Sequence, residues 1–302
     1  MTEQELQQER RERWRLAGNA IRTLDDARAF LEAVGFSLMY PVRPAISAPT
    51  FIGAYVGAED NLPTINQAFS DSRAQEAMEL MVRLLREQGA YEANLFGETS
   101  FLLSPAVFPF FYALMGDKNP KQPPKLIGRA KASHLAIDTF KALQEHGPQS
   151  ENNLRQRLGG ALSAVAMDRA LGELWSALRI TRVDYSPEQG ATWDLLYRWS
   201  PEVVRLGLSY SAPEALSALI SKYLECMIAV EPEEIENFFS HMTSRSKVRE
   251  VVKALTGARE FSFVSIGEKT LLQMSPQVVR MPDPSRSQPI HRRSPTRKPN
   301  HG

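Results

Sequence analysis

The chain of 302 residues contains a single cysteine, Cys226, and no long apolar run. One thiol forms no internal disulfide, which predicts a reducing compartment. No stretch approaches the ~20 consecutive apolar residues that a membrane span needs, so we expect no membrane helix. Residues 1–18 are strongly charged and lack an apolar segment, unlike a signal peptide. Cys226 falls on the apolar side of an expected helix, which favours a buried structural thiol over a nucleophile.

Motifs for common catalytic and metal sites are also missing. The sequence has no Walker loop, no GxGxxG, HExxH or CxxC pattern, and no GxSxG nucleophile elbow. None of the five histidines stands at metal-ligand spacing from a second histidine or a cysteine. We therefore expect neither a metal nor a cofactor.

A large excess of positive charge is absent as well, because 36 basic residues face 35 acidic ones and the net charge is only +1. Dedicated DNA-binding domains often have an isoelectric point above ~9, so any basic DNA-binding surface must be local. Three segments are locally basic: a proline-containing linker from residue 116, an apolar-striped helix near residue 250, and the tail. Their basic side chains are also consistent with ordinary solvated surface. The DNA-binding candidates among them are Lys118, Lys121, Lys125, Arg245, Lys247, Arg249 and Lys253.

One pattern occurs three times at the same internal spacing. An amphipathic helix carries apolar residues at positions i, i+3, i+4 and i+7, and 12 positions later a glycine opens a run that contains a Leu-Leu pair and ends in Ser-Pro. A fixed internal period indicates repeated structural units. The helices are marked by Met78, Met81, Val82 and Leu85, by Leu171, Leu174, Trp175 and Leu178, and by Val248, Val251, Val252 and Leu255; the glycines are Gly97, Gly190 and Gly267.

Two further helices are expected before each repeated helix, and a β-hairpin after it. Helix, helix, helix, hairpin is the order of a winged helix, so we predict an α+β, mainly helical chain of three tandem winged-helix domains. One alternative is a generic α+β protein with chance repeats, and another replaces residues 23–115 by a different α+β module.

The prediction divides the chain into six parts. They are a charged, solvated N-terminal helix with pairs such as Glu9 to Arg13 (1–22), winged helices at 23–115, 127–208 and 209–278, a linker at 116–126, and a disordered basic tail at 279–302.

Certain sequence segments within this arrangement resemble the AlkZ/YcaQ-like winged-helix family. They are a Leu-x-x-Ala-Arg helix that leads to Gly35-Phe36, the block 171–197 with its Trp-Asp-Leu-Leu-Tyr-Arg, and Pro201. The resemblance implies a bacterial DNA glycosylase or a relative of one, an enzyme class that excises alkylated or crosslinked bases. It also implies three winged helices bent into a C around duplex DNA.

The sequence departs from this family at the catalytic motif. Family glycosylases carry Gln-x-Gln or Gln-x-Asp just after the Gly-aromatic pair, where these groups position water or stabilise charge. Here Leu38 and Tyr40 fall at the two polar positions. Leucine cannot orient water, and a tyrosine with a pKa of ~10 is a poor base. The catalytic residues therefore stay unknown, although Glu92 and Glu98 lie in the first expected wing.

Three functions remain open on these grounds. The first is a DNA-binding relative without the usual motif, in which Arg155, Arg157 and Arg169 add to the basic residues named above. The second is an active glycosylase with a changed catalytic residue, and the third is a protein-interaction scaffold. Duplex DNA, damaged or intact, is the expected partner, and a protein partner is the alternative. The expected location is a bacterial cytoplasm, with association with the nucleoid as an option.

Overall fold

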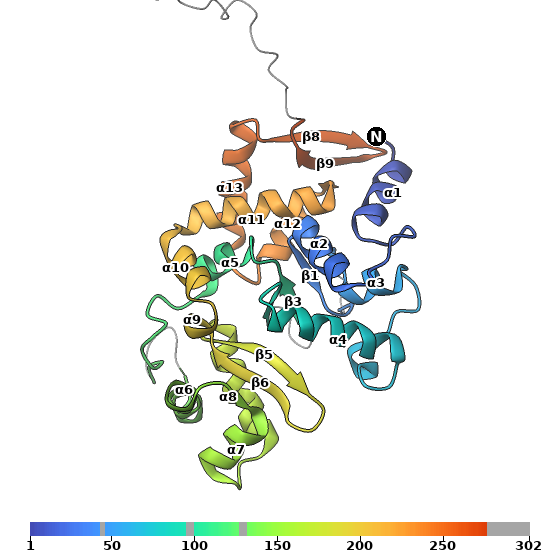
Figure 1. Ribbon diagram of the computed structural model, residues 1–302. Helices are drawn as coiled ribbons and strands as arrows, with labels where there is room; N and C mark the ends of the chain where they lie inside the picture. Colours follow the sequence, from blue (N-terminus) through green and yellow to red (C-terminus); the bar gives the residue numbers. More distant parts are fainter. Residues whose placement is uncertain (43–45, 95–99, 127–131, 277–302) are drawn as a thin grey trace, which may run out of the picture.

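The computed structural model describes residues 1–42, 46–94, 100–126 and 132–276. Within these ranges three units follow one chain order: a helix, a short strand, two helices and a β-hairpin (Figure 1). In each unit the short strand pairs antiparallel with the last hairpin strand, giving the sheet orders β1-β3-β2, β4-β6-β5 and β7-β9-β8. The prediction of an α+β chain of three tandem winged helices is confirmed, and residues 23–115 do not form a different kind of module.

The first unit contains an additional 3-10 turn before its third helix. Thr23 begins its first helix with a capping box to Asp26, and Gly35 ends it with a φ of +80°. Its elements are α2 (Leu24–Val34), β1 (Phe36–Leu38), α3 (Phe51–Val56), η1 (Ile65–Gln67), α4 (Ser72–Arg86), β2 (Tyr91–Ala93) and β3 (Phe101–Leu103).

The second and third units have longer hairpins. The second consists of α6 (His134–His146), β4 (Gln149–Ser150), α7 (Glu151–Gly159), α8 (Ala164–Ser176), β5 (Ile180–Ser186) and β6 (Gly190–Leu195). The third consists of α11 (Ala212–Met227), β7 (Ala229–Val230), α12 (Pro232–Phe239), α13 (Arg245–Gly257), β8 (Phe261–Ile266) and β9 (Lys269–Met274).

The first and third units share one apolar core. Phe36 of β1 stacks on Tyr223 of α11 with ring centroids 5.9 Å apart, and both rings contact Phe238 of α12. The helix α5 (Phe108–Met115) extends this core and packs on α10 (Pro201–Ser209), which follows the short α9 (Leu196–Trp199). The second unit has its own core around Phe140, although Leu178, just after α8, packs in the core of the first and third units; elsewhere the second unit meets the first across a surface.

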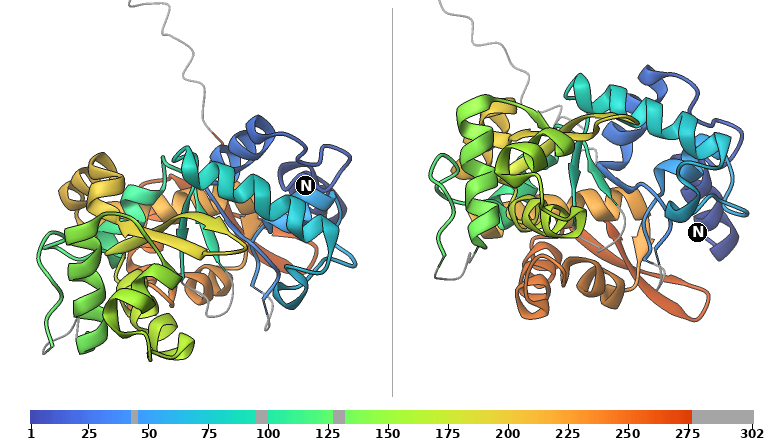
Figure 2. Two further views of the ribbon diagram at one scale, coloured as in Figure 1. Left: turned by 60° about the horizontal axis from the view of Figure 1, so that its bottom comes forward. Right: turned by 90° about the horizontal axis from the view of Figure 1, so that it is seen from below.

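That surface is formed by the second unit's hairpin and the third helix of the first unit. The β5–β6 hairpin lies along α4, and β5 also contacts β2 (Figures 1 and 2). Arg86 of α4 donates to the Asp184 carboxylate of β5 at 2.7 Å. The linker is also held in place, because the buried Arg179 donates to Asp117 and to the Gln122 carbonyl at 2.5 Å each.

The N-terminal helix α1 (Glu3–Arg13) exposes most of its residues, as expected, and it also makes specific contacts with the third unit. Leu6 is buried against the third unit's sheet. Arg10 donates to the carbonyls of Met227, at 2.8 Å, and Ala229, and Arg13 donates to the carbonyl of Glu225. Carbonyls at a helix C-terminus lack intrahelical donors, and these arginines satisfy those at the end of α11.

In the described part of the chain, no helix has the length and apolar character that crossing a membrane requires. Gly97, Glu98 and the tail from residue 279 lie outside the described residues.

Candidate functional site

A cavity of about 480 Å³ lies between the first and second units. Its walls come from the end of β1, the η1–α4 region and the β2–β3 edge on one side, and from α7, α8, β5 and β6 on the other. The cavity lies where the surfaces of the two units face each other and their side chains do not fill the space between them. The residues that line it are Met39, Tyr40, Ile65, Ala68, Phe69, Met78, Met81, Asn94, Ser100, Glu151, Trp175, Arg182, Tyr185, Gly190 and Ala191.

The two positions that match the family's catalytic motif have different environments. Leu38 is 1% exposed and packs in the apolar core that the first and third units share. Tyr40 lines the cavity, and burial, reinforced by the Asp71 carboxylate, raises the pKa of Tyr40 to about 12. A phenol with this pKa stays protonated at neutral pH, so it can donate a hydrogen bond but cannot act as a base.

An arginine is fixed at the cavity wall by two tryptophans and a buried glutamate. The guanidinium carbon of Arg182 lies 5.4 Å from the ring centre of Trp175 and 5.5 Å from that of Trp193. Its Nη1 lies 3.2 Å from Oε1 of Glu92, whose side chain is fully buried in β2. The indole N–H of Trp175 donates to the Glu92 carbonyl at 2.9 Å. These contacts join the units and hold Arg182 in one orientation.

This cluster contains polar atoms whose hydrogen-bonding capacity is unused. Glu92 Oε2, Arg182 Nε and Trp193 Nε1 are buried and make no hydrogen bond within the described residues. Buried polar groups are nearly always paired, so three orphaned atoms in one cluster distinguish this wall from ordinary packing. Glu92, which the sequence placed in the first expected wing, lies in β2 and supports Arg182 from behind the cavity.

One carboxyl group reaches the cavity directly. Glu151 opens α7 after the capping residue Ser150 and lines the cavity beside Gly190. Burial raises the pKa of Glu151, and the carboxyl of Asp168, which shares a hydrogen bond with it, raises that pKa further. A carboxyl with a raised pKa beside a cavity has the properties of a general acid or base.

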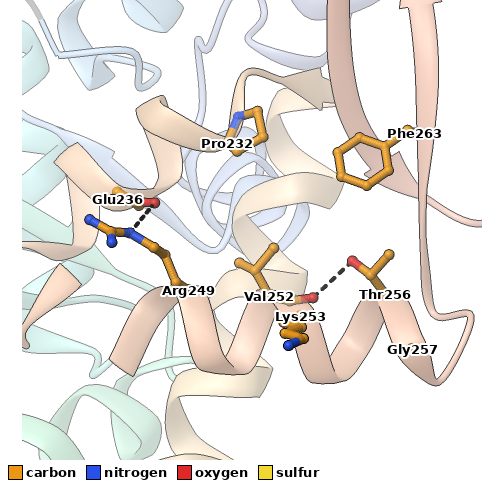
Figure 3. A pocket seen from close by; sticks show the side chains of 8 residues that line it. All are labelled: Pro232, Glu236, Arg249, Val252, Lys253, Thr256, Gly257 and Phe263. Carbon is orange, nitrogen blue, oxygen red and sulfur yellow. Dashed lines mark hydrogen bonds and ion pairs between the residues drawn. The ribbon is translucent and has the colours of Figure 1, made fainter. Parts of the chain in front are cut away.

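The four basic residues predicted on the third unit's helix are all exposed, and two of them also pair with side chains of α12. Arg249 donates to Oε1 of Glu236 and Arg245 to Oδ1 of Asn237, both at 2.8 Å and both on α12. Lys247 and Lys253 are exposed. Figure 3 shows the Arg249–Glu236 pair at one end of a pocket whose other side carries Phe263, which is 56% exposed.

The remaining predicted DNA contacts lie on the second unit and the linker. Arg155 donates to the Leu162 carbonyl and so braces the turn between α7 and α8. Arg157 is exposed on α7, and the Arg169 side chain is 84% exposed on α8. In the linker, Lys121 and Lys125 are exposed, and the exposed Lys118 lies 3.4 Å from the Ala113 carbonyl.

Arg182, Trp193 and Glu151 were not predicted as site residues from the sequence. Trp175 was recognised only as part of an apolar stripe, and no spacing in the sequence relates β5 to β2. Across the described ranges, no group of three or more His, Cys, Asp or Glu side chains is placed to hold a metal ion.

Comparisons with known proteins agree with this architecture. The structure of the Streptomyces sahachiroi DNA glycosylase AlkZ superposes with a TM-score of 0.58 at 14% sequence identity, covering 91% of this chain and 70% of that one. No curated protein matches the chain. A family model described as "DNA glycosylase AlkZ-like" matches residues 71–291. The chain therefore belongs to the AlkZ-like DNA glycosylase family.

Proposed function

We propose that this protein binds duplex DNA, with preference for damaged DNA, and does so without the catalytic motif usual in its family. The observation that carries the proposal is the environment of the motif positions. Leu38 is packed in an apolar core, and Tyr40 keeps its proton. Neither side chain can activate water at a sugar carbon, whereas the family membership supports DNA as the partner.

The exposed cations would hold the phosphates. Lys247 and Lys253 project from α13, the helix that a winged helix places in the major groove. Arg157 and Arg169 of the second unit, with Lys121 and Lys125 of the linker, would extend this contact. Arg245 and Arg249 are already paired with α12 and would contribute less. The protein would act in the bacterial cytoplasm, where its DNA partner lies.

Charge removal on α13 tests this proposal. The double variant Lys247→Ala/Lys253→Ala should bind a duplex more weakly, and its plot of log affinity against log salt should be shallower by about 1 per lost phosphate contact. Arg205→Ala is the matched control, because Arg205 is an exposed cation on α10 that pairs with Glu202. Equal affinities and equal salt slopes for all three proteins would count against DNA contact by α13.

A second candidate function is base excision through a changed catalytic residue, and Glu151 is the observation that favours it. Its carboxyl lines the same cavity as Tyr40, and its raised pKa suits proton transfer. If the protein releases bases from alkylated DNA, Glu151→Gln should lower the rate by about 100-fold or more, the range for loss of a general acid or base. Tyr40→Phe should have a smaller effect, because it removes one hydrogen-bond donor.

Release of bases by the wild type and no loss of rate in Glu151→Gln would exclude Glu151 as that residue. No base release from any alkylated duplex that the protein binds would support the first candidate.

A further inference from the structure

We infer that the third unit binds an acidic, extended peptide segment of a protein partner along the open edge of β8. Three features of the third unit support this: an edge strand that no other element covers, an apolar groove beside that strand, and positive charge at the groove. Use of this surface does not depend on the proposed DNA binding, because the surface and the class of partner are both different.

The edge strand of the third sheet is open, unlike the equivalent strands of the other two sheets. β2, β5 and β8 occupy the same edge position in the three sheets. In the first two units, β2 and β5 contact each other, and β5 also lies along α4. β8 packs on β9 and α13, and in the described part of the chain no element runs along its outer side, at the top of Figure 1. One of three equivalent edges is therefore available to a partner.

β8 lacks the features that usually protect an edge strand from pairing with another chain. Its six residues include no charged side chain and no proline. Its pairing with β9 is regular, whereas the pairing of β5 with β6 is interrupted between Arg182 and Asp184. Charges, prolines and bulges are common means of blocking edge pairing, so β8 is able to accept a further strand.

The alternation of the strand determines which backbone groups face the open side. Ser275 donates to the Glu260 carbonyl at 2.8 Å, and these two residues continue the register of β8 and β9. Backbone groups alternate in direction along an antiparallel strand, so the N–H and C=O groups of Phe263 and Ser265 point away from β9. A strand added to β8 would form its hydrogen bonds with these groups.

A groove beside β8 would receive an apolar side chain of the added strand. The groove has a volume of about 480 Å³ and lies between α12, α13 and Phe263 (Figure 3). Phe263 is 56% exposed, and Pro232 and Val252 in the groove are partly exposed. Burial of this apolar surface by a partner's side chain would be favourable. Peptides that add to a sheet edge commonly gain affinity from main-chain bonds and specificity from such a pocket.

Charge at the groove favours an acidic partner. Arg249 and Lys253 line the groove, and Lys253 has no ion-pair partner within the described ranges. Glu236 is the one acidic side chain among the described lining residues, and Arg249 already pairs with it. A basic segment would be repelled. Antiparallel pairing of two copies through β8 would place both α13 helices on the same face and bring their cations together, which disfavours a second copy as the occupant.

The test measures binding of a fluorescent nonapeptide with the sequence EEVTFTVEE to the full chain, by anisotropy and without DNA. The wild type should bind this probe, and Phe263→Ala should weaken binding by about fivefold or more, the loss expected when a contributing interface side chain is truncated. Leu208→Ala is the control, because Leu208 is an exposed apolar residue on α10. It should leave the affinity unchanged. The charge-reversed probe KKVTFTVKK should bind more weakly than the acidic one.

Two further measurements test strand addition itself. The acidic probe N-methylated throughout its apolar centre lacks the N–H donors of a β-strand and should not bind. Hydrogen exchange followed by NMR should show slower exchange of the Phe263 and Ser265 amides when the unmodified probe is bound.

The opposite results would overturn the inference. They are no binding of the acidic probe, equal binding of the basic probe, binding that Phe263→Ala does not weaken, or unchanged exchange at both amides. Duplex binding that Phe263→Ala weakens, with neither peptide bound, would assign the groove to DNA instead. DNA binding that is unaffected by Phe263→Ala would leave the proposed function standing whatever the peptides do.

Discussion

Tyr40 and Leu38 lie two positions apart, yet one lines the cavity and the other is packed in the core shared by the first and third units. Leu38 is the last residue of β1, and strand geometry directs it, like Phe36, into that core. The chain leaves the strand after Leu38, so the side chain of Tyr40 need not point to the same face as Phe36 and Leu38. A substitution that restores a polar group at position 38 would bury that group without a partner, which costs about 1–3 kcal/mol.

The raised pKa of Glu151 makes the stability of the fold depend on pH. Because the folded state raises the Glu151 pKa, the folded state binds the carboxyl proton more tightly than the unfolded chain does. The resulting stabilisation is complete below the ordinary glutamate pKa of about 4.3 and is lost as the pH rises through the folded value. Glu151→Gln should therefore gain unfolding free energy relative to the wild type between pH 4 and pH 7.

Urea unfolding of both proteins at the two pH values measures this difference. Glu188→Gln removes an exposed carboxyl from the same unit's hairpin and reports the general effect of losing one negative charge. A difference between wild type and Glu151→Gln that is constant across this pH range would contradict the predicted linkage.

Cys226 is fully buried on α11, and this burial raises its pKa to about 12. The thiolate is the reactive form, so the native protein should react with a thiol reagent only as fast as it unfolds. Adding denaturant should release one fast-reacting thiol per chain. Rapid labelling of the native protein would show that the packing around α11 does not shield this thiol in solution.

Among the helices and strands, α1 makes contacts that its sequence gave little reason to expect. Its charged composition predicted a solvated helix, and ten of its eleven residues are indeed at least partly exposed. Only Leu6 is buried, but Arg10 and Arg13 reach the free carbonyls at the end of α11. A pattern of charges cannot reveal such contacts, because the acceptors are backbone atoms more than 200 residues away.

Removing this contact tests its contribution. Arg10→Ala should lower the unfolding free energy by about 2 kcal/mol, since it removes a charged donor that bonds two backbone carbonyls. Arg11→Ala is the control, because Arg11 makes only a loose 3.9 Å ion pair with Glu59. The measurement is chemical denaturation of the full chain. Equal midpoints for the two variants would mean that α1 does not stabilise the third unit.

The repeated units themselves were predictable. The apolar spacing of α4, α8 and α13 and the following glycines are local properties of the sequence, and the structure places a hairpin after the second and third of these helices at Gly190 and Gly267. The association of the units was not predictable in the same way. Arg182 meets Glu92 across 90 positions, and no local pattern links those strands. For this reason the family and fold followed from the sequence, and the cavity emerged only from the structure.

At the level of the whole molecule, the first unit lies between the other two, sharing a core with the third and a surface with the second (Figure 1). This arrangement divides the tasks that we propose. The shared core fixes the first and third units as one block, while the surface toward the second unit leaves a cavity lined by aromatic and polar groups. Exposed cations on α7, α8, α13 and the linker would supply the phosphate contacts.

Binding of a fluorescent duplex at low and at physiological salt, with and without an abasic site, tests the central proposal most directly. We expect tight binding at low salt, a steep loss of affinity as salt rises, and tighter binding of the duplex that contains the abasic site. No binding to either duplex at low salt would contradict DNA binding by this protein and would favour a protein partner instead.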